Sequence, residues 1–168
     1  DATALQIKML NISKGPAVRA MRVQSDKVAY KTYMQNVTSN TENLDIYISL
    51  VDKLIVDDNQ IKGVTLEDGT SIYGKRVIIT TGTYLSSCIL VGKTSTPSGP
   101  DHENTNYGLS DSLRDLGFKL IRLKTGTPAR IYTDSIDFSN AQLELGTNLP
   151  LTFSYETNPS DMIPFEKQ

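Results

Sequence analysis

The sequence has few of the residues that build covalent or metal-bound frameworks. Its 168 residues include one cysteine, Cys88, and one histidine, His102. One cysteine provides neither a disulfide framework nor a thiolate zinc site. His102 has no second histidine or cysteine near it, which favours a surface-loop residue over a metal ligand. We therefore predict no metal site, and we interpret Cys88, which lies in an apolar stretch, as a packed thiol.

Long apolar runs and a strong net charge are missing as well. The most apolar stretch, residues 77–92, is interrupted by threonine, glycine and serine, so it does not predict a membrane span. Residues 1–5 lack the basic region and apolar core of a signal peptide. We expect a cytoplasmic protein that does not contact membranes. Because the net charge is −2, RNA binding would need local basic clusters.

The first half of the sequence alternates between extended and helical patterns. Gly15-Pro16 marks a break after an extended segment, and spacings of three and four then predict a helix. Alternating apolar residues with a hairpin signal at Asp68-Gly69 predict an antiparallel β-meander over about residues 44–73. The predicted elements are an extended segment at 4–12, a helix at 17–37 and strands at 44–50, 53–56, 61–66 and 70–73.

The second half contains a short β-branched run, residues 77–81, that leads into Gly82. This run is typical of a buried strand in a parallel sheet. Further predictions are an extended segment at 85–91, a polar loop at 94–106, a helix on Leu109, Leu113 and Leu116 that ends at Gly117, a strand at 118–123, a helix at 139–145 capped by Ser139 and Gln142, and an irregular tail from residue 150.

The order of a helix, a strand, a meander and then a strand followed by Thr-Gly is typical of the second half of a Rossmann-type domain. We predict an α/β fold, a partial Rossmann-type FAD-binding domain with an antiparallel β-meander. A buried strand followed by an ordinary turn is the alternative for residues 77–83. The chain has no Gly-x-Gly-x-x-Gly match, the motif that places a helix N-terminus against the cofactor's phosphates.

Two basic clusters are candidate anion sites, with a solvated surface as the alternative for each. The first contains Lys14, Arg19 and Arg22, and on a helix the two arginines would share a face. The second surrounds a Gly-Thr-Pro segment and contains Arg122, Lys124, Thr125 and Arg130. Its amides, hydroxyls and cations suit a flavin, a nucleotide or an RNA phosphate.

Three sequence blocks together resemble the GidA/MnmG family: residues 10–26, residues 78–85, and residues 122–130 with 135–139. The resemblance runs from about residue 7 to about residue 154. It implies that the chain is an internal fragment of an FAD enzyme about four times as long. Residues 1–123 would belong to the FAD-binding domain, and residues 124–168 would begin the inserted domain that follows.

The resemblance also implies a reaction, its partners and its cofactors. Family members work with a GTPase partner, MnmE, and add a carboxymethylaminomethyl-type group to carbon 5 of the wobble uridine (U34) of tRNA. They use FAD, a folate one-carbon donor and NADH as reductant, and they are homodimers. The catalytic cysteines and the glycine-rich fingerprint of the family lie outside this sequence, so we predict that the fragment alone is inactive.

The family's cofactor contacts match a few positions of this sequence. The backbone of Val51 would face the adenine, and the strand-Thr-Gly segment matches Thr81, Gly82 and Thr83. A further contact falls at Asn106, where many members have serine. The two basic clusters would line the flavin and substrate side.

Three other functions remain alternatives. The related folate- and FAD-dependent tRNA uridine methyltransferase shares much of this domain, although the block from Lys14 to Arg19 argues against it. A non-catalytic RNA-binding or partner-binding module would resemble the enzyme without its activity. An NAD(P)H–flavin disulfide reductase would need a Cys-x-x-x-x-Cys pair, which this sequence does not contain.

Overall fold

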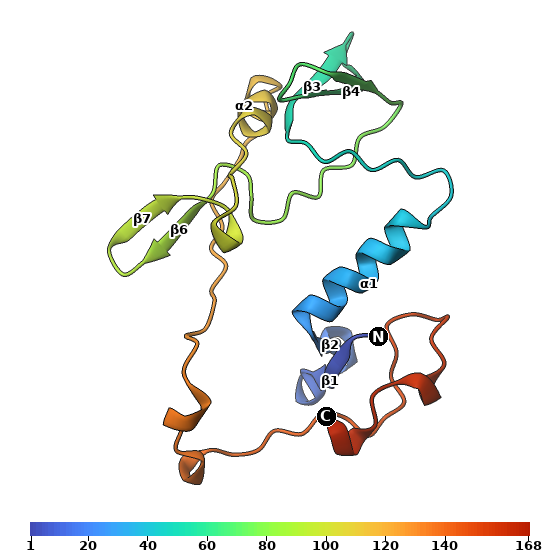
Figure 1. Cartoon of the computed structure of the whole chain (residues 1–168), viewed down its shortest axis with the longest axis vertical. Coiled ribbons are helices and arrows are strands. Elements are labelled where there is room, and N and C mark those ends of the chain that lie inside the picture. Colours follow the sequence, from blue (N-terminus) through green and yellow to red (C-terminus); the bar gives the residue numbers. More distant parts are fainter. The chain divides into compact units, whose positions relative to one another are not determined.

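The computed structural model describes all 168 residues, which form two compact units. The first unit combines residues 1–46 with residues 131–168, and the second contains residues 47–130 (Figure 1). The first has strands β1 (Ala4–Leu10) and β2 (Ala20–Ser25) and helix α1 (Lys27–Ser39). The second has strands β3 (Val51–Asp57), β4 (Gln60–Leu66), β5 (Ser71–Tyr73), β6 (Cys88–Val91) and β7 (Thr94–Pro97) and helix α2 (Gly108–Asp115). Neither helix has the length and apolar character of a bilayer-spanning segment.

The β1–β2 hairpin has one apolar and one polar face. Its antiparallel register places Ile7 opposite Val23 and Met9 opposite Met21, and Lys8 opposite Arg22. Residues directly opposite one another project from the same face of a sheet, and successive residues alternate between faces. Ile7 is only 2% exposed, so the face with Ile7 and Met21 is the packed one. The predicted extended segment at the start of the chain is confirmed as β1.

The predicted helix over residues 17–37 is wrong in its first half. Residues 20–25 form β2, and α1 begins only at Lys27. The side chain of Asp26 accepts a hydrogen bond from the Ala29 amide (2.8 Å), which caps the helix. The local spacings that predicted a helix are outweighed by pairing with β1, a strand ten residues earlier in the sequence.

The C-terminal part of the first unit follows the open edge of β1. The Thr147 amide donates to the Ile7 carbonyl oxygen (2.8 Å), and the Ile7 amide donates to Gln168 Oε1 (3.0 Å). The Asp1 carboxylate accepts hydrogen bonds from the amides of Phe153 and Ser154 (3.0 Å each). As predicted, residues 150–168 contain no helix or strand beyond single 3₁₀ turns.

The predicted helix at residues 139–145 is also wrong. A 3₁₀ turn spans Phe138–Asn140, and the side chain of Asp137, not Ser139, caps it. Hydrogen bonds from Ser139 and Asn140 lower the pKa of Asp137. Leu143 is 81% exposed. Because the short segment has no packed apolar face, burial stabilises a helix there by too little free energy to offset the cost of helix nucleation.

The meander is confirmed as the three-stranded antiparallel sheet β3-β4-β5 in the second unit. At the predicted Asp68-Gly69 turn, Asp68 Oδ1 accepts a hydrogen bond from the Thr70 amide (2.9 Å), and this bond lowers the pKa of Asp68. Gly69 has φ 85°, a conformation that glycine adopts without steric cost. The strand predicted at 44–50 is absent, and Ile48 is 99% exposed.

Two further predicted strands, residues 77–81 and 118–123, are irregular in the structure. Ile78 is 86% exposed and Leu123 is 84% exposed, which contradicts the prediction of a buried parallel strand. A strand forms only where a neighbouring strand receives its backbone hydrogen bonds. No strand of this chain pairs with either segment.

Helix α2 packs on β3 and is confirmed up to its predicted end before Gly117. Leu109 and Leu113 are buried, and the Leu54 amide donates a hydrogen bond to Ser112 Oγ (3.0 Å). The predicted extended segment at 85–91 contains β6, whereas the predicted polar loop at 94–106 contains β7 as well. Cys88 is exposed on β6, so its interpretation as a packed thiol is wrong. A two-stranded hairpin has no second layer to cover it.

Candidate functional site

The side chain of Asn106 joins the start of β3 to the start of α2. Its Nδ2 donates a hydrogen bond to the Val51 carbonyl oxygen (2.9 Å), and its Oδ1 accepts one from the Leu109 amide (3.0 Å). The second bond satisfies an amide in the first turn of α2, as a helix-capping residue does. Two of the predicted cofactor residues, Val51 and Asn106, are therefore neighbours although 55 positions separate them.

A set of hydroxyl groups fixes the backbone around Asn106. Thr105 Oγ1 accepts a hydrogen bond from the Ser87 amide (2.6 Å) and donates one to the Tyr84 carbonyl oxygen (2.8 Å). The Asn106 amide donates to the same Tyr84 oxygen (2.8 Å), and Ser87 Oγ donates to the Ser98 carbonyl oxygen (3.0 Å). These bonds hold residues 84–87 against residues 98–106.

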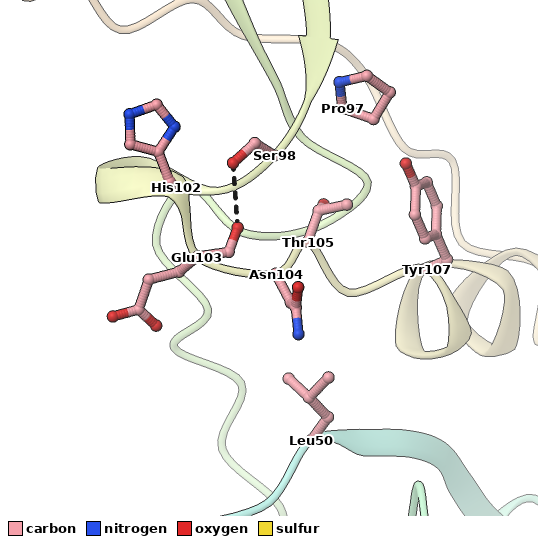
Figure 2. A pocket seen from close by; sticks show the side chains of 8 residues that line it. All are labelled: Leu50, Pro97, Ser98, His102, Glu103, Asn104, Thr105 and Tyr107. Atoms are coloured by element: carbon pink, nitrogen blue, oxygen red, sulfur yellow. Dashed lines mark hydrogen bonds between the residues drawn. The ribbon is translucent and has the colours of Figure 1, made fainter.

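A polar pocket of about 400 Å³ lies beside this network. Figure 2 shows its lining side chains, with the carboxylate of Glu103 directed away from the others and the hydrogen bond from Ser98 Oγ to the Glu103 carbonyl oxygen (3.1 Å). Its volume is near the lower end of the range of about 300–1,000 Å³ for ligand pockets. The lining residues are Leu50, Pro97, Ser98, His102, Glu103, Asn104, Thr105 and Tyr107.

Residues 81–84 form a turn at the opposite end of the hydroxyl network. The Tyr84 amide donates a hydrogen bond to the Thr81 carbonyl oxygen (3.2 Å), and Gly82 has φ 55°. Gly82 and Thr83 are exposed, and no backbone atom lies within 4 Å of the position where a Cβ on Gly82 would be. A flat group therefore has direct access to the backbone of this turn.

The basic residues of the second unit are exposed, and one of them is fixed. Arg122 Nη1 donates a hydrogen bond to the Ser86 carbonyl oxygen (2.6 Å), beside the network that holds Asn106. Lys124, Thr125 and Arg130 lie in an irregular exposed segment, where the structure gives their side chains no hydrogen bond or ion pair.

The basic residues of the first unit lie on and next to the β1–β2 hairpin. Arg22 lies on the polar face of β2 opposite Lys8, whose Nζ forms a salt bridge with Glu144 Oε2 (2.7 Å). Arg19 precedes β2 in an extended conformation, three residues from Arg22. Side chains an odd number of residues apart point to opposite sides of an extended chain, so the prediction that the two arginines share a face is wrong. Lys14 lies exposed in the loop between the strands.

An apolar groove of about 560 Å³ lies next to the meander in the second unit. Val77 and Ile79, from the segment predicted as a buried strand, line it together with side chains of β3, β4 and α2. These side chains are apolar except for one asparagine: Leu54, Val56, Asn59, Ile61, Leu113, Leu116 and Phe118. The second unit therefore leaves apolar surface open beside the meander.

The polar pocket lies beside Asn106, but none of its lining residues is one of the predicted cofactor contacts. The pocket offers hydroxyl and amide groups, and the Gly82 turn offers backbone without a side chain. The Val51 carbonyl oxygen already accepts a hydrogen bond from Asn106. The chain contains no group of three histidine, cysteine or acidic side chains that would hold a metal ion.

Sequence reasoning missed Thr105, Ser87 and the Lys8–Glu144 pair. The partners of Thr105 and Ser87 lie about 20 residues away, so no local pattern indicates them. Lys8 alternates with apolar neighbours in β1 and becomes notable only when its register with Arg22 is known.

Comparison with known proteins gives one consistent result. The family model for glucose inhibited division protein A matches residues 1–167. A Mycoplasma mycoides protein named "tRNA uridine 5-carboxymethylaminomethyl modification enzyme MnmG" is 54% identical over 169 residues, which is 100% of this chain and 27% of that protein. The Bacillus subtilis protein of the same name is 44% identical over 94% of this chain and 25% of its own length.

Solved structures agree with this result. Aquifex aeolicus GidA superimposes with a TM-score of 0.81 and 44% identity, over 95% of this chain and 26% of the GidA chain. A GidA-related protein from Thermus thermophilus, with a TM-score of 0.53 and 19% identity over 58% of this chain and 44% of its own, shares the fold alone. The chain thus spans about a quarter of the length of its MnmG relatives. It belongs to the glucose-inhibited division protein A (GidA/MnmG) family.

Proposed function

We propose that this chain is part of a longer FAD-dependent enzyme, the parent protein, which modifies carbon 5 of the wobble uridine (U34) of tRNA. The reaction adds a carboxymethylaminomethyl-type group. The observation that carries the proposal is the match with MnmG proteins over nearly every residue, at 44–54% identity. Because the chain spans about a quarter of those relatives, the reaction belongs to the parent protein and not to this chain alone.

Within the parent protein, we assign one end of FAD to the region around Val51, Thr81–Thr83 and Asn106. The hydrogen bond between Asn106 and Val51 and the exposed Gly82 turn support this assignment. FAD supplies the redox chemistry, and these residues bind and orient it. The chain lacks a glycine-rich fingerprint for the phosphates, so we expect the rest of the parent protein to supply it.

The other participants in the reaction follow from the family resemblance. They are NADH as reductant, a folate one-carbon donor, the GTPase partner MnmE and a second copy of the parent protein in a homodimer, all in the cytoplasm. The exposed cations of the two units, among them Lys14, Arg122 and Lys124, suit the phosphates of tRNA because phosphate contacts carry most of the affinity for nucleic acids.

A flavin absorbance scan and an FAD titration on this chain and on the parent protein test the cofactor assignment. The parent protein should bind one FAD per chain, and this chain should bind FAD weakly or not at all. Gly82→Val in the parent protein should weaken FAD binding, because its side chain would cover the exposed backbone. Gly92→Val is the matched control, because Gly92 is exposed, has a similar φ of 58° and has no atom within 4 Å of its Cβ position. Tight one-to-one binding by this chain alone would contradict the need for the rest of the parent protein.

The reaction itself is tested by mass spectrometry of tRNA. Cells that lack the parent gene should lose the carboxymethylaminomethyl-type group at U34 and regain it when the gene is restored. Loss of a methyl group from a uridine at another position would identify the related tRNA uridine methyltransferase instead. Unchanged tRNA would support a non-catalytic binding module.

A further inference from the structure

The N-terminal part of the first unit is basic, although the chain as a whole is slightly acidic. Residues 2–41 contain one acidic residue, Asp26, and six basic ones: Lys8, Lys14, Arg19, Arg22, Lys27 and Lys31. Lys8 and Arg22 face each other directly on the polar face of the β1–β2 hairpin. Like charges directly opposite each other in a sheet are destabilising. The pair therefore favours an anion between or above the two side chains.

Glu144 supplies that anion in the structure. Its Oε2 lies 2.7 Å from Lys8 Nζ, and its backbone oxygen accepts a hydrogen bond from Gln6 Nε2 (3.0 Å). Hydrogen bonding and Coulomb attraction from Lys8, with a smaller attraction from Arg22, lower the pKa of Glu144. The segment that carries Glu144, residues 131–168, has six acidic residues and one lysine, Lys167. The acidic residues are Asp134, Asp137, Glu144, Glu156, Asp161 and Glu166.

The Glu144 carboxylate is the exchangeable member of this contact. The Glu144 side chain is 72% exposed, whereas that of Lys8 is 28% exposed. The segment is held to β1 by the backbone oxygen of Glu144 and the amide of Thr147, so the carboxylate rotates away without releasing it. An exposed ion pair of this kind contributes little to stability, and a competing anion displaces it readily.

We propose that Lys8 and Arg22 form a binding site for a phosphate of the RNA backbone, and that Glu144 fills this site when RNA is absent. Carboxylate and phosphate are recognised by the same cationic donors. Glu144 then acts as a competitor that lowers RNA affinity. The inference rests on the proposed function, because tRNA is the source of the phosphate.

The test uses the parent protein and a labelled tRNA substrate, with Kd measured by fluorescence anisotropy at several KCl concentrations. Glu144→Gln should bind tRNA roughly two- to fivefold more tightly, the range that corresponds to an exposed ion pair. Lys8→Gln should bind more weakly, and the slope of log Kd against log salt should fall by about 0.7–0.9, as for one lost phosphate contact.

Glu156→Gln is the matched control, because it removes the same charge from the same segment, and Glu156 has no cationic partner in the structure. It should change Kd less than about twofold, within the effect of an unpaired surface charge. In the double variant Lys8→Gln/Glu144→Gln, the gain from Glu144→Gln should disappear. Equal gains from Glu144→Gln and Glu156→Gln would overturn the inference, since net charge alone would then explain both.

Further outcomes distinguish the failure of this inference from the failure of the proposed function and from a site for free phosphate. If the parent protein binds no tRNA at all, the proposed function fails. If it binds tRNA but Lys8→Gln and Glu144→Gln leave Kd and the salt slope unchanged, only the phosphate site fails. Inorganic phosphate should compete with tRNA no better than chloride at equal ionic strength. Stronger competition that depends on Lys8 would indicate a site for free phosphate and would overturn the assignment to RNA.

Discussion

Replacement of Asn106 by alanine should destabilise the second unit by roughly 2 kcal/mol. The substitution removes the cap of the Leu109 amide, a contribution of about 1 kcal/mol. It also leaves the Val51 carbonyl oxygen without its donor at a half-buried position, which costs about another 1 kcal/mol. A shift of this size is measurable by urea denaturation of this chain, followed by circular dichroism.

Two other replacements of Asn106 separate the two hydrogen bonds. Asn106→Asp at neutral pH keeps an acceptor for Leu109 but places a carboxylate oxygen next to the Val51 carbonyl oxygen. Its stability should rise in acid, when a protonated carboxyl group donates to Val51 again. Asn106→Ser keeps the cap and loses the longer reach to Val51. If Asn106→Ala unfolds at the same urea concentration as the wild type, the reasoning that Asn106 holds β3 to α2 is wrong.

Three further predictions concern stability. Asp26→Ala should reduce the stability of α1 by about 1 kcal/mol, since it removes the cap of Ala29, whereas Asp26→Asn should be nearly neutral; thermal melting by circular dichroism distinguishes them. Gly63→Ala should destabilise the meander by about 1–3 kcal/mol, because its Cβ would meet the Ile72 carbonyl oxygen and lie 2.9 Å from Tyr73 Cα, while Gly126→Ala, with open space around it, should not change the urea midpoint. The lowered pKa of Glu144 means that its ion pair stabilises the fold at neutral pH and that this contribution is lost as the pH falls below the value of about 4.3 for a free glutamate. Glu144→Gln should therefore show a weaker loss of stability between about pH 6 and about pH 3 than the wild type, and identical pH profiles would contradict this assignment.

The elements that the sequence predicted correctly depend on local chemistry. The turn at Asp68 and Gly69 needs only a side-chain acceptor and a positive φ, and both are properties of the residues themselves. Helix α2 follows from the spacing of Leu109 and Leu113, and both side chains are buried. The mixed α/β class could be predicted because both helical and strand patterns occur along the sequence and some of each are correct.

The elements that the sequence predicted wrongly depend on a distant partner. Residues 20–25 alternate between polar and apolar side chains, with Met21 and Val23 on the packed face, but the helical spacing continues through them. The strand conformation is selected by hydrogen bonding to β1, which ends ten residues earlier and lies outside residues 17–37, the range whose spacing predicted a helix. In the site, the family resemblance implied that Val51 and Asn106 both contact the cofactor. The hydrogen bond between them has no signal in the sequence.

The uncovered apolar surface of this chain lies next to the proposed FAD site. Only four large apolar side chains are buried: Ile7, Leu66, Leu109 and Leu113. The uncovered surface includes the apolar groove and residues 77–81, which lead directly into the Gly82 turn. Relatives about four times as long have the additional residues to cover this surface. Strands that pair with residues 77–81 would fix the Gly82 turn at the same time, so completion of the sheet and formation of the FAD site should be one cooperative event in the parent protein.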